Sequence, residues 1–208
     1  STTGGEFFFT HPKRMNQNLH QFLRAQELIK ELGCVNFNKS KFLNKYKKEG
    51  SIVLHPGASD IQRSWLDKYW IELANMLYPK NKISIVKCDQ SKTIIKKIEN
   101  LDLSVDVFEG DLITLMDWLS SQKCLIAPDS MAGHLASYVG IPTISLFGSQ
   151  DPSLVKPYHN LAKVVTPDKS CVHNRKHWRL CSLCMASISP KKVFINLVNH
   201  ISFIESNL

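Results

Sequence analysis

The chain has 208 residues, 43% of them hydrophobic, which is enough for one sizeable domain with a buried core. It contains no apolar run of the roughly 18 residues that cross a bilayer and no secretory signal pattern, so we expect no transmembrane helix. The net charge of +8 fits a solvated basic surface, and it also favours nucleic acid, an anionic membrane surface or a phosphorylated ligand as partner. Because no helix-turn-helix, RRM-type or zinc-finger pattern accompanies the charge, we expect no sequence-specific nucleic-acid binding.

The first 50 residues carry one helical pattern and one polar segment. Apolar residues at helical spacing predict a helix over Met15–Leu32, which Gly33 ends. Asn36–Gly50 is polar and rich in lysine, which is typical of a linker. The main domain is therefore expected to begin at residue 51.

From residue 51 onward, short apolar strands alternate with helices. Strands are predicted at 52–54, 83–86, 105–108, 124–126 and 143–147, and helices at 65–77, 91–98, 111–121 and 135–139. This alternation implies right-handed crossovers and therefore an α/β fold, a Rossmann-like parallel sheet with helices on both faces. Residues 151–189 show few signals and are expected to wrap the sheet edge, and a helix over Pro190–Ile204 closes the chain.

The first predicted strand ends in the turn His55-Pro56-Gly57-Ala58-Ser59, with Arg63 four residues further on. Gly57 allows the backbone to approach a ligand closely, and a guanidinium binds two phosphate oxygens at once. The turn could therefore hold a diphosphate. It could equally be an ordinary strand-to-helix turn with a surface arginine. It is not a P-loop, because the pattern GxxxxGK[ST] is absent from the sequence.

A second polar turn, Asp129-Ser130, follows the strand at 124–126, and His134 comes four residues after Ser130. Asp129 and Ser130 could simply cap a helix, and His134 could be an interior histidine bonded to the backbone. The alternative is a phosphate site, because a helix N-terminus presents free N–H groups and the positive end of its dipole. In open α/β sheets ligands bind at the carboxyl ends of the strands, so both turns could converge on one ligand.

Three motifs keep this order along residues 51–158. They are His55–Ser59 with Arg63 and Trp65, then Asp129-Ser130 with His134-Leu135-Ala136, then Leu146–Ser149 with Asp151-Pro152. In combination they resemble glycosyltransferase family 9, the ADP-heptose–lipopolysaccharide heptosyltransferases of GT-B fold. The resemblance implies that residues 51–189 form the nucleotide-sugar donor domain, with 190–208 as a C-terminal helix and 1–50 as the end of an acceptor domain and its linker.

Carried over by position, the resemblance assigns the donor site. Gly57, Ala58, Ser59 and Arg63 would lie at the donor diphosphate. The turn Asp129–Met131 would offer backbone N–H groups to phosphate, Ser130 would add its hydroxyl, and His134 would support the same site. Gly110 would lie near the adenine and Lys87 near the ribose. Met131 departs from the family pattern, which has glycine there, whereas this chain has glycine at 133.

The resemblance also implies a missing part. The family's catalytic carboxylate lies in the N-terminal acceptor domain, and no acidic residue of 1–50 has a recognisable catalytic setting. We therefore expect the parent protein to be a heptosyltransferase-like enzyme and this chain alone to bind the donor without transferring sugar. The acceptor would be lipopolysaccharide core, and the enzyme would be cytoplasmic, peripheral at the inner membrane. A UDP-sugar GT-B enzyme and a non-catalytic nucleotide-binding module remain as alternatives.

Cysteines gather near the C-terminus. Cys171, Cys181 and Cys184, with His177, have the ligand types of a zinc or iron site, and His173 lies in the same segment. A single CxxC also fits reduced thiols in a loop or a disulfide. The donor reaction requires no cofactor, so any metal here would be structural.

Overall fold

The computed structural model describes residues 10, 15–33, 46–173 and 180–207. The chain divides into two compact units, one of residues 1–41 and 151–155, the other of residues 42–150 and 156–208. In the first unit, helix α1 (Gln21–Glu31) packs against the short helix α6 (Pro152–Val155). The helix predicted from Met15 begins at Gln21 instead, because His20 is its N-cap and accepts a hydrogen bond from the Phe22 N–H.

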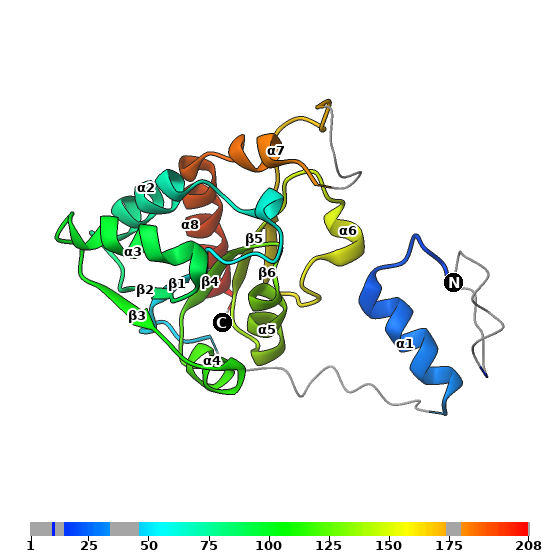
Figure 1. Cartoon of the computed structure of the whole chain (residues 1–208). Coiled ribbons are helices and arrows are strands. Elements are labelled where there is room, and N and C mark those ends of the chain that lie inside the picture. The colour runs from blue at the N-terminus through cyan, green and yellow to red at the C-terminus, as the bar shows by residue number, and fades with distance from the viewer. Residues whose placement is uncertain (1–9, 11–14, 34–45, 174–179, 208) are drawn as a thin grey trace. The chain divides into compact units, whose positions relative to one another are not determined.

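The second unit is built on a six-stranded parallel sheet with the strand order β3-β2-β1-β4-β5-β6 (Figure 1). The strands are β1 (Ile52–Leu54), β2 (Ile83–Val86), β3 (Val105–Phe108), β4 (Cys124–Pro128), β5 (Thr143–Leu146) and β6 (Ala162–Val165). The central strands β1, β2, β4 and β5 are buried along their whole length, as expected of parallel strands covered on both faces.

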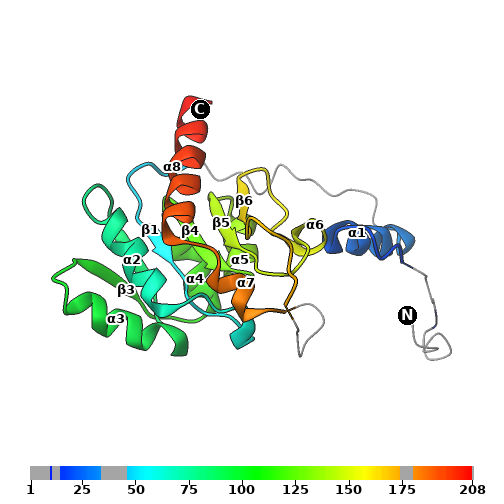
Figure 2. The same ribbon diagram turned by 90° about the horizontal axis from the view of Figure 1, so that it is seen from above.

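Helices cover both faces of this sheet, so the predicted Rossmann-like fold class is confirmed (Figures 1 and 2). On one face α2 (Asp67–Leu77), α3 (Lys92–Glu99) and α8 (Pro190–Ser206) bury a core that includes Trp70, Ile94 and Leu197. On the other face α4 (Leu112–Leu119) and α5 (Met131–Val139) pack over Val53 and Leu125. Short helices η3 (Ile61–Arg63), η4 (Asp89–Ser91) and α7 (Ser182–Ala186) complete the unit.

Two sequence expectations were wrong in this unit. Residues 162–165 form the sixth strand, hydrogen-bonded beside β5, rather than a segment that wraps the sheet edge. Helix α5 begins at Met131, one turn earlier than predicted, and extended Ser130 takes the N-cap position without a side-chain capping hydrogen bond. The predicted end of α5 is confirmed at Gly140, which has φ 82° and so adopts the left-handed conformation that glycine tolerates best.

No helix among the described residues is both long and apolar enough to span a membrane.

Candidate functional site

The strand order places a topological switch point between β1 and β4. The chain leaves β1 toward β2 on one side and leaves β4 toward β5 on the other. Leu54 lies opposite Ile126, so the turns after the two strands begin at the same level of the sheet. Ligands of doubly wound sheets bind in the crevice that forms at this point. Both sequence-predicted turns therefore meet where the fold favours a ligand.

Arg63 and Asp129 join the two turns. The Arg63 Nη1 lies 3.5 Å from the Asp129 Oδ2, and the side chains are 30% and 11% exposed. Arg63 ends η3, which Asp60 begins by accepting a hydrogen bond from the Gln62 N–H. The Asp129 N–H donates to the Leu146 carbonyl, which ties this turn to β5. Two loops from distant parts of the sequence thus hold one charged pair at the switch point.

Burial raises the pKa of Asp129 above its usual range, while the Arg63 cation and the charge of His134 lower it. Burial therefore outweighs the two cations in this chain. A carboxylate so placed restrains the guanidinium but is itself poorly solvated. Arg63 also has a buried Nε with no hydrogen-bond partner among the described residues. Part of its donor capacity is consequently left for another acceptor.

A small pocket that opens to solvent adjoins this pair, with about 200 Å³ of empty space when the open solvent at its mouth is included. Its walls come from η3, the ends of β4 and β5, and the segment around α7. The described lining residues are Gln62, Arg63, Asp129, Leu146, Gly148, Ser149, Gln150, Leu180, Cys181 and Met185. The Gln150 Oε1 is buried without a partner in the described part of the chain, as is Arg63 Nε. Unmatched polar atoms around a concave site are typical of a binding pocket.

The start of α5 places the other predicted phosphate-binding groups beside Asp129. Ser130 Oγ is buried and has no hydrogen-bond partner within the described residues. Met131 is 53% exposed, so the residue that replaces the family glycine does not fill the site. Gly133 instead serves helix packing, because an added Cβ would lie 3.2 Å from both Ser145 Oγ and Pro157 Cγ. His134 is half-buried and acts electrostatically on Asp129.

The predicted residues of the first turn, Gly57, Ala58 and Ser59, are not among the described lining residues of the pocket. A Cβ on Gly57 would lie 2.8 Å from the His55 ring and 3.2 Å from Cys88 Sγ, so glycine is required there. Ala58 is buried, and its carbonyl accepts a hydrogen bond of 3.0 Å from Gln90. Ser59 is exposed and does not belong to the described lining of the pocket.

The remaining donor-site predictions, Lys87 and Gly110, lie at the carboxyl ends of β2 and β3. Lys87 Nζ lies 2.7 Å from the carboxylate of Glu109, and both side chains are well exposed. A Cβ on Gly110 would come within 2.5 Å of Thr114 Oγ1, so the tight turn before α4 requires this glycine. Both residues lie at the edge of the sheet where the strands have their carboxyl ends, as the donor site requires. Neither is among the described lining residues of the Arg63–Asp129 pocket.

The cysteine cluster comprises Cys171, His173, Cys181 and Cys184. One ligand atom from each residue lies within 4.8 Å of the others. His173 Nδ1 lies 3.7, 3.4 and 3.6 Å from the sulfurs of Cys171, Cys181 and Cys184. In a tetrahedral zinc site a ligand nitrogen and sulfur lie about 3.6 Å apart, given the usual bond lengths. The four residues therefore fit one tetrahedral metal ion.

The three cysteines of the cluster differ in how readily they form the thiolate that binds a metal. All three are free thiols, so they form no disulfide in this structure. A hydrogen bond involving the His173 backbone is the largest cause that lowers the pKa of Cys171, to about 6, whereas burial raises the pKa of Cys184 to about 12. His177, which the sequence suggested as the nitrogen ligand, lies outside the described residues. His173 supplies that nitrogen in the described cluster.

Sequence reasoning missed the wall of the pocket that α7 provides. Leu180, Cys181 and Met185 line it, yet they follow a segment with no strong pattern. The CxxC at 181–184 was the available signal, because Cys181 is the N-cap of this short helix and Cys184 lies within it. Gln62 and Gln150 were also missed, since isolated glutamines carry no pattern.

The fold is that of a Rossmann-like domain with a pocket beside its switch point. The model of glycosyltransferase family 9 (heptosyltransferase) matches residues 15–183, and the chain therefore belongs to that family. A lipopolysaccharide core heptosyltransferase, OpsX of Haemophilus influenzae, is 28% identical over 123 residues, which cover 56% of this chain and 35% of that protein.

Solved structures share the fold. The Escherichia coli heptosyltransferase WaaC with ADP matches with a TM-score of 0.73 at 15% identity, covering 93% of this chain and 61% of that one. The iron-containing dodecameric glycosyltransferase TibC of enterotoxigenic E. coli matches with a TM-score of 0.56 at 10% identity, covering 79% and 49%. The chain thus spans about a third of the curated relative and less than two thirds of these structures.

Proposed function

We propose that this chain is the donor-binding part of a heptosyltransferase. The donor would be an ADP-sugar, most specifically ADP-heptose, and the sugar acceptor would be lipopolysaccharide core. Family membership supports the reaction class. Support for the donor comes from the WaaC structure, which contains ADP, and support for the acceptor comes from OpsX, a lipopolysaccharide core heptosyltransferase.

The observation that carries the proposal is the Arg63–Asp129 pocket at the switch point. The pair brings a cation to the crevice, and Arg63 Nε and Gln150 Oε1 belong to lining residues and are buried without partners among the described residues. Ser130, the residue after Asp129, also has a buried Oγ without a partner there. A diphosphate would accept hydrogen bonds from Arg63 and Ser130 and from the N–H groups that begin α5. Asp129 would hold the guanidinium in place rather than contact the phosphates, since two anions repel.

The same groups suit the chemistry of transfer. An acceptor hydroxyl attacks the anomeric carbon, the bond from that carbon to the diphosphate oxygen breaks, and ADP leaves with the electron pair. Negative charge grows on the leaving oxygens, and Arg63 with the α5 N–H groups would stabilise it. The base that takes the hydroxyl proton would come from the acceptor domain, outside residues 51–208.

Cys171, His173, Cys181 and Cys184 would hold a structural zinc or iron ion. Support comes from the tetrahedral fit of their donor atoms. A further parallel is TibC, which is iron-containing. A closed set of three sulfurs and one nitrogen leaves no position for substrate, so the ion would stabilise the fold rather than take part in transfer.

Lipopolysaccharide core is a phosphorylated glycan on a membrane. The net charge of +8 would favour peripheral contact with such a surface on the cytoplasmic side of the inner membrane.

Calorimetric titration of the chain with ADP and with UDP tests the donor site. We expect ADP to bind in the micromolar range and UDP to bind much more weakly. Arg63→Ala should weaken ADP binding roughly 10- to 100-fold, the usual value of a charge-assisted hydrogen bond. Lys96→Ala is the matched control, because it removes an exposed positive charge on α3, away from the pocket.

Tighter binding of UDP than of ADP would mean that the donor is a UDP-sugar instead of an ADP-sugar. Binding of ADP that is unaffected by Arg63→Ala would place the nucleotide elsewhere. Failure to bind either nucleotide would overturn the proposed donor site and favour a module with another role.

A further inference from the structure

Helix α7 belongs to two sites at once. Its N-cap Cys181 and its residue Cys184 are metal-ligand candidates, and Leu180, Cys181 and Met185 line the Arg63–Asp129 pocket. Met185 also closes tightly on the loop after β5, because a Cβ on Gly148 would lie 2.9 Å from Met185 Cγ. The position of α7 therefore fixes one wall of the pocket.

The same segment supports the turn that carries Arg63. Helix α7 packs against η3, which Arg63 ends. Just beyond α7, the Ile188 carbonyl accepts a hydrogen bond of 2.8 Å from Trp65 Nε1. Trp65 follows Arg63 closely and is itself buried, in edge-to-face contact with Trp70. A shift of α7 would therefore move both Arg63 and the wall of the pocket that α7 forms.

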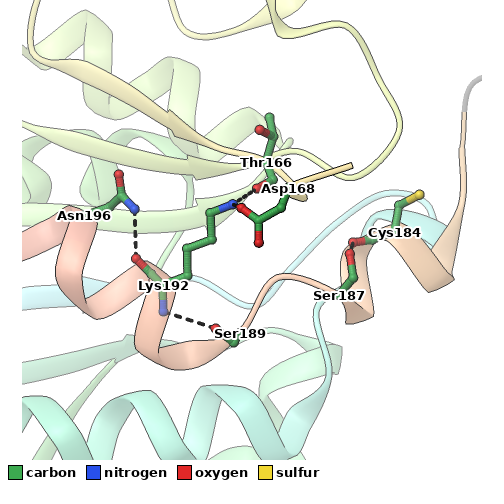
Figure 3. Close-up of polar contacts among 7 residues, drawn as sticks. All are labelled: Thr166, Asp168, Cys184, Ser187, Ser189, Lys192 and Asn196. Atoms are coloured by element: carbon green, nitrogen blue, oxygen red, sulfur yellow. Dashed lines mark hydrogen bonds and ion pairs between the residues drawn. The ribbon is translucent and has the colours of Figure 1, made fainter. Parts of the chain in front are cut away.

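The other two ligands reside on a separate segment. Cys171 and His173 follow β6 on a stretch that Lys192 anchors, since Lys192 Nζ contacts the Thr166 carbonyl at 2.6 Å and the Asp168 carboxylate (Figure 3). On the α7 side, Ser187 Oγ donates to the Cys184 carbonyl at 2.8 Å (Figure 3). The two segments contribute two ligands each, so a bound ion would cross-link them.

We propose that the metal ion at this cluster sets the affinity of the diphosphate pocket, because it holds α7 against η3 and the β5–α6 loop. Cys171, His173, Cys181 and Cys184 are positioning residues in this scheme: they bind the ion, and the ion fixes the wall that faces the nucleotide. The inference rests on the proposed function, since ADP is its probe. The addition to that function is that donor binding depends on a metal ion that does not itself contact the donor.

The test compares the metal-loaded chain with the same chain after chelation, with metal content by mass spectrometry and ADP affinity by calorimetry. One zinc or iron per chain is expected. Its removal should weaken ADP binding roughly tenfold, and restored metal should restore the affinity. Thermal unfolding in parallel establishes that the stripped chain is still folded at the temperature of the titration.

Variants at His173 separate positioning from simple stability, because this residue is exposed and its replacement disturbs no core packing. His173→Ala should lose metal and ADP affinity together. His173→Cys should keep both, since four cysteines also bind zinc. Val172→Ala is the matched control, because Val172 lies between two ligands and is 90% exposed.

Equal ADP affinity of loaded and stripped chains would overturn the coupling and leave the proposed function standing. Loss of metal in His173→Ala with unchanged ADP affinity would overturn it as well. A chain that binds metal but no ADP in either form would refute the proposed function, and the coupling with it.

Discussion

The carboxylate of Asp129 meets the guanidinium of Arg63 across the switch point of the sheet, at 3.5 Å. Each residue follows a different strand, and neither strand neighbours the other in sequence. The pair therefore forms only when β1 and β4 are in register. An intact pair therefore indicates that the native sheet has formed. The protonation state of Asp129 affects the free energy of unfolding and, under the proposed function, the binding of ADP.

The pH dependence of stability should change in Asp129→Asn. Burial raises the pKa of Asp129 in the folded chain, so the folded state binds a proton more readily than the unfolded state. This carboxyl therefore favours folding most at low pH, and the contribution is lost as pH rises through the raised pKa. Denaturant unfolding from pH 3 to 7 should show the asparagine variant gaining stability relative to the wild type as pH increases. A constant difference across that range would contradict the expectation.

Ser130→Ala should separate folding from binding. The buried Ser130 hydroxyl has no partner in the described part of the chain, so its removal should leave the unfolding free energy unchanged or raise it by up to about 1 kcal/mol. ADP affinity should fall about 3- to 10-fold if the hydroxyl binds phosphate. Ser137→Ala is the matched control, because Ser137 Oγ on the same helix is also buried and unpartnered there. Equal ADP affinities of the two variants would remove Ser130 from the site.

Acid should destabilise the fold through His200. Burial lowers the pKa of His200 below 6.5, although its hydrogen bond to the Leu161 carbonyl, 2.9 Å long, opposes the shift. The unfolded chain then takes up the proton first, so stability is complete above pH 6.5 and declines as pH falls below it. His200→Gln should show a shallower decline in chemical unfolding between pH 7 and 5. An unchanged slope would assign the loss to other groups, such as buried His55.

Gly133→Val should destabilise the domain. A Cβ at this position lies 3.2 Å from Ser145 Oγ and Pro157 Cγ, so these neighbours must already give by a few tenths of an ångström, and the two methyl groups of valine add to the crowding. Overpacking of this kind costs about 1–3 kcal/mol. Thermal unfolding measures the loss. Met131→Ala on the same helix removes an exposed side chain and should stay within about 0.5 kcal/mol.

Much of the fold could be predicted because its strands are short apolar runs that alternate with amphipathic helices. Residues 52–54, 83–86 and 105–108 are strands in both the prediction and the structure. Strand β6 was missed because Ala162–Val165 contains Lys163, is half-buried and carries no strong apolar run. Its pairing with β5, a tertiary contact, decides its conformation.

The site was predictable where the fold alone dictates convergence. Arg63 and Asp129 follow adjacent strands, so their meeting could be inferred from parallel topology. The role of α7 could not, because no periodic pattern links residues 180–185 to η3. The sequence spacing of the cysteines was enough to predict which three thiols form the cluster. The choice of histidine depended on how the chain turns after β6, which sequence spacing does not determine.

The strand order also has a consequence for how the chain reaches its native state. Strand β1 lies at the centre, yet one of its two neighbours, β4, is supplied only by Cys124–Pro128. A growing chain that ends before this stretch has a sheet with an open, apolar centre. Parallel strands are joined by long connections, which makes their pairing slow and the intermediate prone to aggregation. The pocket beside β4 can therefore form only after residues 124–128 have been synthesised.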